Sequence, residues 1–112
     1  MLKKTIILII SILLLTTALK AKENIMILKL KDGDVKIKLF PDVAPNHVKR
    51  ITELADSGKY DGVVFHRVID GFMAQTGDVQ FGNSSSDNFN LSRAGMGGSD
   101  LPDLKEEFND LP

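Results

Sequence analysis

The segment 65–78 of the sequence constrains the fold more than any other part of the chain. It has the pattern of two short strands that meet at Asp70-Gly71, a pair of residues suited to the positive φ angles of a tight hairpin. The same segment brings one arginine, one glutamine and several large apolar side chains close together. This mixture is unusual for a plain hydrophobic core, so we expect a hairpin with a chemical role.

The register of this hairpin decides which side chains share a face. A two-residue loop at 70–71 would place Arg67 on the opposite face from Met73 and Gln75. A three-residue loop at 70–72 would instead pair Arg67 with Gln75. We favour the three-residue loop, because the glutamine amide can then fix the arginine fork while methionine and phenylalanine form an apolar floor.

The segment resembles the signature of the cyclophilin family of peptidyl-prolyl isomerases. The matching residues are Phe65-His66-Arg67-Val68-Ile69, Gly71-Phe72-Met73, Gln75 and Gly77-Asp78. The resemblance implies that Arg67 is the catalytic residue. It also implies that three residues line the proline-binding site: Phe72, Met73 and Gln75. Two positions depart from the usual family pattern, Asp70 and Thr76, and neither carries one of these roles.

The resemblance implies a reaction in which no bond is made or cleaved. Rotation about an X-Pro bond is slow because amide resonance must be broken, with a barrier of about 18–20 kcal/mol. A catalyst has to hold the prolyl ring in an apolar pocket and to stabilise the twisted amide, whose nitrogen has regained a lone pair. An N–H of Arg67 can be aimed at that nitrogen while the guanidinium stays charged at any useful pH, so we expect neither a metal nor an organic cofactor.

Spacing alone leaves a second interpretation of Arg67 open. A strand arginine can also form a structural ion pair, here with Asp70 or Asp78. The neighbouring His66 can be imagined as a general acid, but by strand alternation it points away from Arg67. We therefore expect His66 to be a hydrogen-bonded structural histidine.

The N-terminus predicts a secretory signal peptide over residues 1–21. Two lysines precede an apolar run over 6–15 that is broken only by a serine, and small residues follow it. The run is too short for a membrane span, which needs about 20 apolar residues. Cleavage after Ala18 satisfies the small-residue rule better than cleavage after Ala21. We therefore expect an exported protein, periplasmic or secreted, which contacts a membrane only through an uncleaved signal segment.

Charge and composition narrow the possible partners. Loss of residues 1–18 removes two of the 14 basic residues against 15 acidic ones, which leaves a formal net charge of −3. Nucleic acid is therefore not an expected partner. The absence of cysteine excludes thiol catalysis and zinc-thiolate sites, and the two histidines fall on different expected elements, so no metal site is expected.

Two further elements follow from periodicity. Apolar residues alternate with lysines over 26–30 and, after Asp32-Gly33, over 35–39, which predicts a hairpin with one buried and one solvated face. A helix is expected over about 45–57, because a proline at its start, apolar residues at helical spacing and a glycine just beyond its end all agree. His47 lies near the polar start of this helix, and we expect it to be solvated.

The resemblance extends over about residues 24–112. The segments 82–88 and 95–99 have loop-forming compositions, as in the family, and the Glu-Phe pair at 107–108 also fits the family. The resemblance implies a mainly β fold, a cyclophilin-like antiparallel β-barrel with a capping helix. In this interpretation residues 22–112 form an incomplete isomerase domain whose C-terminal strands are missing from the chain.

The implied function is cis/trans isomerisation of X-Pro bonds, by which a peptidyl-prolyl isomerase assists the folding of exported proteins. Its expected partners are proline-containing unfolded or exported polypeptides. We expect the protein itself to be a monomer. Two alternatives remain open: a non-catalytic module that binds such chains in the same groove, and an inactive truncated fragment. Replacement of Arg67 by alanine should abolish turnover but spare binding, and the DNA immediately beyond Pro112 would show whether the reading frame continues.

Overall fold

The computed structural model describes residues 23–112, and the signal peptide predicted over 1–21 lies outside the described residues. The described residues fall into two compact units, one that ends at Leu39 and one that runs from Phe40 to Pro112. The helix found in residues 23–112 is neither long enough nor apolar enough to cross a membrane.

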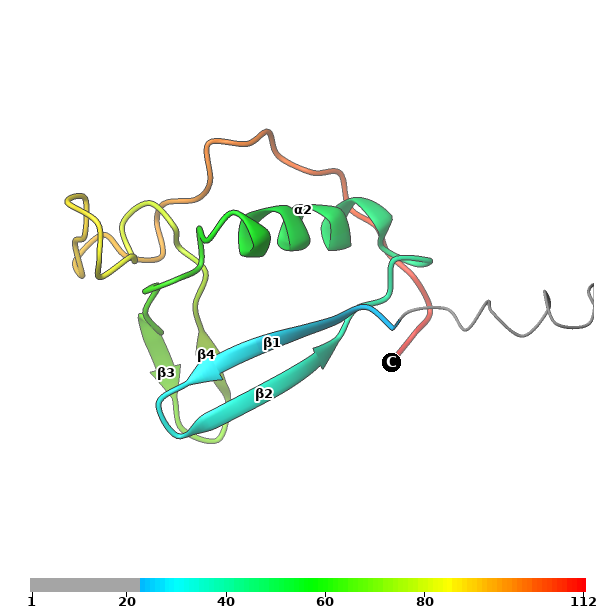
Figure 1. The fold of residues 1–112 in the computed structure, drawn as a ribbon, viewed down its shortest axis with the longest axis horizontal. Coiled ribbons are helices and arrows are strands. Elements are labelled where there is room, and N and C mark those ends of the chain that lie inside the picture. Colours follow the sequence, from blue (N-terminus) through cyan, green and yellow to red (C-terminus); the bar gives the residue numbers. More distant parts are fainter. Residues whose placement is uncertain (1–22) are drawn as a thin grey trace, which may run out of the picture. The chain divides into compact units, whose positions relative to one another are not determined.

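The first unit contains an antiparallel β-hairpin (Figure 1) made of β1 (Ile25–Leu30) and β2 (Gly33–Lys38). Leu30 lies opposite Gly33, so the two-residue loop is Lys31-Asp32, and the glycine of the Asp-Gly pair is the first residue of β2. Gly33 has a φ of +140°, a value that glycine adopts without strain. The predicted hairpin is confirmed.

One face of this hairpin is half-buried. Met26 lies opposite Ile37 and Leu28 lies opposite Val35, so the apolar residues share a face as the alternation predicts. Met26, Leu28 and Ile37 are half-buried, whereas Val35 is exposed. The expectation of a buried face is therefore met only in part. The other face carries two exposed isoleucines besides its lysines.

The second unit begins with α2 (Pro45–Asp56), whose first residue is a proline that has no N–H to leave unpaired. Gly58, with a φ of +74°, ends the helix in a Schellman motif. In this motif the N–H of Gly58 donates to the carbonyl of Ala55 at 3.0 Å, and the N–H of Lys59 donates to the carbonyl of Leu54 at 2.9 Å. The predicted helix and its glycine end are confirmed.

The apolar core of the described residues is small. Leu54 of α2 is the one apolar residue of 23–112 that is buried, and it is 8% exposed. The other apolar residues of the helix are half-buried: Val48, Ile51 and Ala55. The predicted apolar stripe is thus present, but most of it is not fully covered.

A second hairpin follows the helix and consists of β3 (Arg67–Ile69) and β4 (Met73–Gln75). The segments that flank it lie against each other, because Val63 and Asn83 form an isolated antiparallel bridge and the N–H of Val64 donates to the carbonyl of Gly82 at 2.9 Å. The antiparallel strands and the one helix of residues 23–112 confirm the mainly β class. Within residues 23–112 each hairpin is a separate two-stranded sheet, so the predicted barrel is not closed there.

Candidate functional site

The register of the second hairpin confirms the three-residue loop. Arg67 lies opposite Gln75, and Ile69 lies opposite Met73. Because strand residues alternate between faces, Arg67, Met73 and Gln75 share one face. The structure therefore brings together three of the four residues that the sequence analysis assigned to the site.

The turn of this hairpin depends on one glycine. Gly71 has a φ of +69°, and the N–H of Phe72 donates to the carbonyl of Ile69 at 3.0 Å. Asp70 does not have a positive φ, so the expectation that the Asp-Gly pair supplies two such angles is wrong for its first residue. In a three-residue loop the left-handed conformation is needed only once, and glycine takes it here.

The side chains of the site are accessible. Arg67 and Gln75 are exposed and Met73 is half-buried. Phe72 lies in the turn and is 78% exposed, so the structure does not place its ring on the apolar floor that we expected. Within residues 23–112 the guanidinium of Arg67 forms no ion pair, with Asp70 and Asp78 included. The group is thus available for an external acceptor.

Asp78, three residues after β4, is the most deeply buried charged residue of the described chain at 4% exposure. Its Oδ1 accepts the N–H groups of Gln80 and Phe81, both at 2.9 Å. Its Oδ2 accepts those of Gly95 at 2.7 Å and Gly97 at 3.0 Å. Burial alone would raise the pKa of Asp78, but these backbone hydrogen bonds hold it below its usual value.

His66 differs from our expectation of a hydrogen-bonded histidine. Its Nδ1 is buried and has no hydrogen-bond partner within residues 23–112. The ring is instead in close contact with backbone, because a Cβ placed on Gly95 would lie 2.7 Å from Nε2 of His66. Packing, rather than hydrogen bonding, therefore positions this ring.

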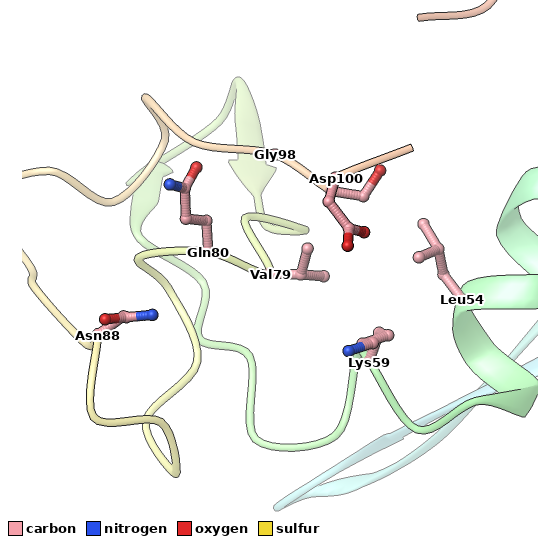
Figure 2. Close-up of a pocket in the computed structure, with 8 residues that line it drawn as sticks. Leu54, Lys59, Val79, Gln80, Asn88, Gly98 and Asp100 are labelled. Atoms are coloured by element: carbon pink, nitrogen blue, oxygen red, sulfur yellow. The ribbon is translucent and has the colours of Figure 1, made fainter. Parts of the chain in front are cut away.

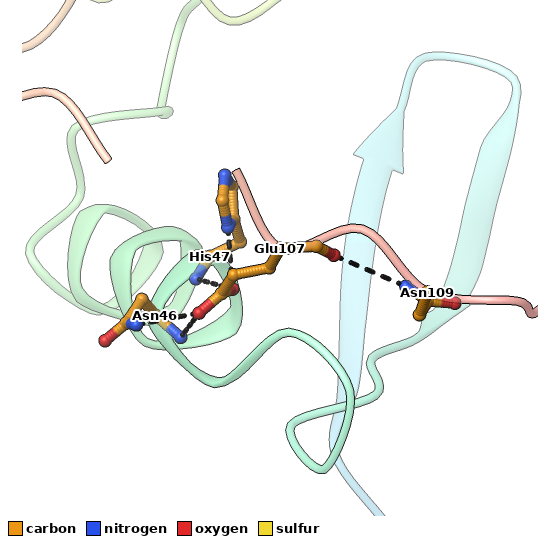
Figure 3. A network of polar contacts seen from close by, with 4 residues as sticks. All are labelled: Asn46, His47, Glu107 and Asn109. Atoms are coloured by element: carbon orange, nitrogen blue, oxygen red, sulfur yellow. Dashed lines mark hydrogen bonds and ion pairs between the residues drawn. The ribbon is translucent and has the colours of Figure 1, made fainter. Parts of the chain in front are cut away.

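Glu107 caps the N-terminus of α2 (Figure 3). Its carboxylate accepts the backbone N–H groups of Asn46 at 2.9 Å and His47 at 3.1 Å, and also the Asn46 side-chain amide at 2.7 Å. His47 is exposed, as predicted, but its Nδ1 also lies 2.7 Å from Oε2 of the same carboxylate, a contact that the sequence analysis did not predict. Partial desolvation would raise the pKa of Glu107, but the hydrogen bonds from His47 and Asn46 lower it to about 2.

A shallow cavity of about 340 Å³ lies elsewhere in the second unit (Figure 2). Figure 2 shows Leu54 on the helix side, with Val79 and Gln80 from the segment after β4 and Asp100 from the later loop. None of the four candidate site residues lines it. The cavity is therefore distinct from the Arg67 face, and an exposed surface rather than this hollow carries the candidate site.

The sequence analysis missed the roles of Asp78 and Glu107. The first could have been suspected, because an aspartate just before a loop often accepts N–H groups two and three residues ahead. The bonds from Gly95 and Gly97, and the contact between Glu107 and a helix start sixty residues earlier, have no local signal in the sequence.

Comparisons with known proteins agree on one family. The family model described as cyclophilin type peptidyl-prolyl cis-trans isomerase/CLD matches residues 25–111. A protein of Brucella suis named probable peptidyl-prolyl cis-trans isomerase is 59% identical over 90 residues, which cover 80% of this chain and 45% of that protein. The chain thus spans about half the length of this curated relative.

Two more distant relatives carry similar names. A peptidyl-prolyl cis-trans isomerase of Rhizopus delemar is 40% identical over 85 residues, which cover 74% of this chain and 12% of that protein. A putative peptidyl-prolyl cis-trans isomerase of Staphylococcus haemolyticus is 41% identical over 76 residues, which cover 60% of this chain and 38% of that protein. No solved structure matches the chain.

Proposed function

The chain belongs to the cyclophilin type peptidyl-prolyl cis-trans isomerase family, and on this premise we propose that it catalyses cis/trans isomerisation of X-Pro bonds in exported polypeptides and so assists their folding. The observation that carries the proposal is the pairing of Arg67 with Gln75 on the face that also bears Met73. In the proposed complex a permanent cation, an amide and an apolar side chain on this face all contact one bound dipeptide.

Arg67 acts on the amide nitrogen of the substrate. In the planar ground state this nitrogen shares its lone pair with the carbonyl and accepts no hydrogen bond, whereas in the twisted state the lone pair is free. An N–H of the guanidinium then donates to it and stabilises the twisted state selectively. A pre-aimed donor of this kind is typically worth about 2.7–4 kcal/mol, on the order of a hundred- to thousand-fold in rate.

Gln75 and the apolar side chains hold the substrate for this step. Gln75 lies directly across the hairpin from Arg67, where its amide can orient the guanidinium or bind the substrate backbone. Met73 provides an adaptable apolar surface for the prolyl ring. Phe72 is exposed at the turn, and in the proposed complex the bound proline covers it.

The test is the isomerisation rate of an Ala-Pro peptide, measured by NMR exchange with purified chain and with variants. Arg67→Ala should lower kcat/KM by about a hundred- to thousand-fold. Arg67→Lys should restore only part of the loss, because lysine is a point charge without the planar fork. Lys36→Ala, which removes an exposed cation from β2, is the control and should leave the rate unchanged.

The same variants separate catalysis from simple binding. If Arg67→Ala retains the affinity for the peptide but loses turnover, the catalytic role of the guanidinium is supported. If the unmodified chain binds the peptide and never accelerates its isomerisation, the protein is a binding module and the proposal fails. Equal turnover in the unmodified chain and Arg67→Ala would also contradict it.

A further inference from the structure

The Asp78 carboxylate connects two segments that are distant in sequence. One of its oxygens accepts N–H groups from Gln80 and Phe81, two and three residues further along the chain, and the other accepts N–H groups from Gly95 and Gly97. Within residues 23–112 no cation pairs with this carboxylate. The carboxylate therefore interacts with backbone N–H groups alone, and it fixes the loop around Gly95 and Gly97 to the segment that follows β4.

The loop that Asp78 holds lies directly on the ring of His66. A Cβ on Gly95 would come within 2.7 Å of Nε2 and 2.9 Å of Cδ2 of His66, distances that no Cβ tolerates. The N–H of the same glycine points to Oδ2 of Asp78 at 2.7 Å. The backbone at Gly95 thus donates its N–H to the carboxylate and lies so close to the imidazole that no side chain fits between them.

His66 directly precedes Arg67, the first residue of β3. Because the ring has a buried Nδ1 without a hydrogen-bond partner in residues 23–112, the close contact with the Gly95 backbone is what keeps it in place. Any shift of the loop therefore passes to the backbone that bears Arg67.

A hydrogen bond also holds the open end of this hairpin. The hydroxyl of Thr76, just after β4, donates to the carbonyl of Val64, just before β3, at 2.9 Å.

We propose that Asp78 is a positioning residue of the candidate site, which fixes the direction of Arg67 through the Gly95 backbone and the His66 ring. The effect on turnover rests on the proposed function, whereas the effect on the geometry of Arg67 does not. Asp78 does not touch the substrate. It acts on the rate because a misplacement of about 1 Å at a catalytic group can cost a hundred-fold.

The first test is Asp78→Asn, which keeps the shape but offers an NH₂ group where Gly95 and Gly97 need an acceptor. We expect kcat for an Ala-Pro peptide to fall about tenfold or more, with KM within about twofold, in a variant whose far-ultraviolet circular dichroism is unchanged. Asp87→Asn makes the same change at an exposed residue of the same segment and should leave kcat unchanged. Equal kcat in the two folded variants overturns the proposal.

A double-mutant cycle tests the route through His66. If Asp78 acts through this ring, His66→Ala lowers kcat on its own, and Asp78→Asn then adds no further loss in the His66→Ala background. Additive losses overturn the route through His66.

A second variant serves if Asp78→Asn does not fold. Gly95→Ala leaves the carboxylate of Asp78 intact but forces the loop away from His66. Full kcat in Gly95→Ala then contradicts the proposal.

NMR tests whether Asp78 positions Arg67 without a measurement of activity. The Nε–Hε resonance of Arg67 should shift in Asp78→Asn and stay in place in Asp87→Asn. If the unmodified chain shows no isomerase activity, the proposed function fails, and this resonance alone decides the positioning role. An unchanged resonance in Asp78→Asn overturns that role, whatever the activity.

Discussion

Nδ1 of His47, in the first turn of α2, lies 2.7 Å from Oε2 of Glu107, although sixty residues separate them in the chain. The residue at the usual capping position, Ala44, has no side chain that could cap the helix. Glu107 takes over this function, since its carboxylate accepts two backbone N–H groups at the positive end of the helix dipole. One carboxylate thus caps the helix and ties the last segment of the chain to it.

Glu107→Gln should destabilise the protein. The amide keeps one acceptor oxygen but loses the charge that the helix start and the imidazole of His47 interact with. We expect the Tm to fall by several degrees, measured by circular dichroism at pH 7. Glu106→Gln is a matched control, because its side chain is exposed on the neighbouring position. Equal Tm values for the two variants would show that the cap does not contribute to stability.

The contribution of Glu107 should also depend on pH. Its folded-state pKa is about 2 and its ordinary value is 4.5, so the carboxylate stabilises the folded state fully above pH 4.5. This stabilisation is lost as the pH falls from about 4.5 to about 2. The difference in unfolding free energy between the unmodified chain and Glu107→Gln should therefore shrink as the pH falls below about 4.5 and vanish near pH 2. A difference that persists at pH 2 would contradict the cap.

The sequence predicted the elements better than the contacts between them. The register of the second hairpin follows from the requirement that Arg67 and Gln75 share a face, and the end of α2 follows from Gly58, because both are local properties of the chain. The partners of Asp78 and Glu107 depend on how distant segments approach each other, and periodicity does not encode that. For the same reason the sequence analysis correctly predicted an exposed His47 but missed its contact with Glu107.

Gly71→Ala should destabilise the second hairpin by about 1–2 kcal/mol. The φ of +69° at this position is unfavourable for a residue with a Cβ, but no atom lies within 4 Å of where that Cβ would be, so backbone strain is the whole cost. Gly71→Asn should cost less, because asparagine tolerates the left-handed region. Urea unfolding of the three proteins measures both effects. A Gly71→Asn variant less stable than Gly71→Ala would show that sterics, not strain, govern the turn.

The proposed export of this protein predicts a defined mature N-terminus. Expressed with residues 1–21 in a bacterium with a periplasm, the protein should be recovered outside the cytoplasm, and N-terminal sequencing should begin at Leu19 or Lys22. A variant with Lys3 and Lys4 replaced by glutamate should remain inside the cell, since the positive region is reversed. Recovery of the protein with its first methionine from the cytoplasm would contradict export.

Phe72→Ala separates substrate binding from folding. The ring is 78% exposed, so its removal uncovers little new surface and should change the unfolding free energy by less than about 0.5 kcal/mol. If the bound proline covers this ring, KM for an Ala-Pro peptide should rise about tenfold, because burial of an aromatic side chain contributes about 1.5–3 kcal/mol. Leu91→Ala, at a position that is 68% exposed in a loop, is the control and should leave KM unchanged. An unchanged KM in Phe72→Ala would place the prolyl ring elsewhere on the hairpin, with Met73 as the remaining apolar contact on the Arg67 face.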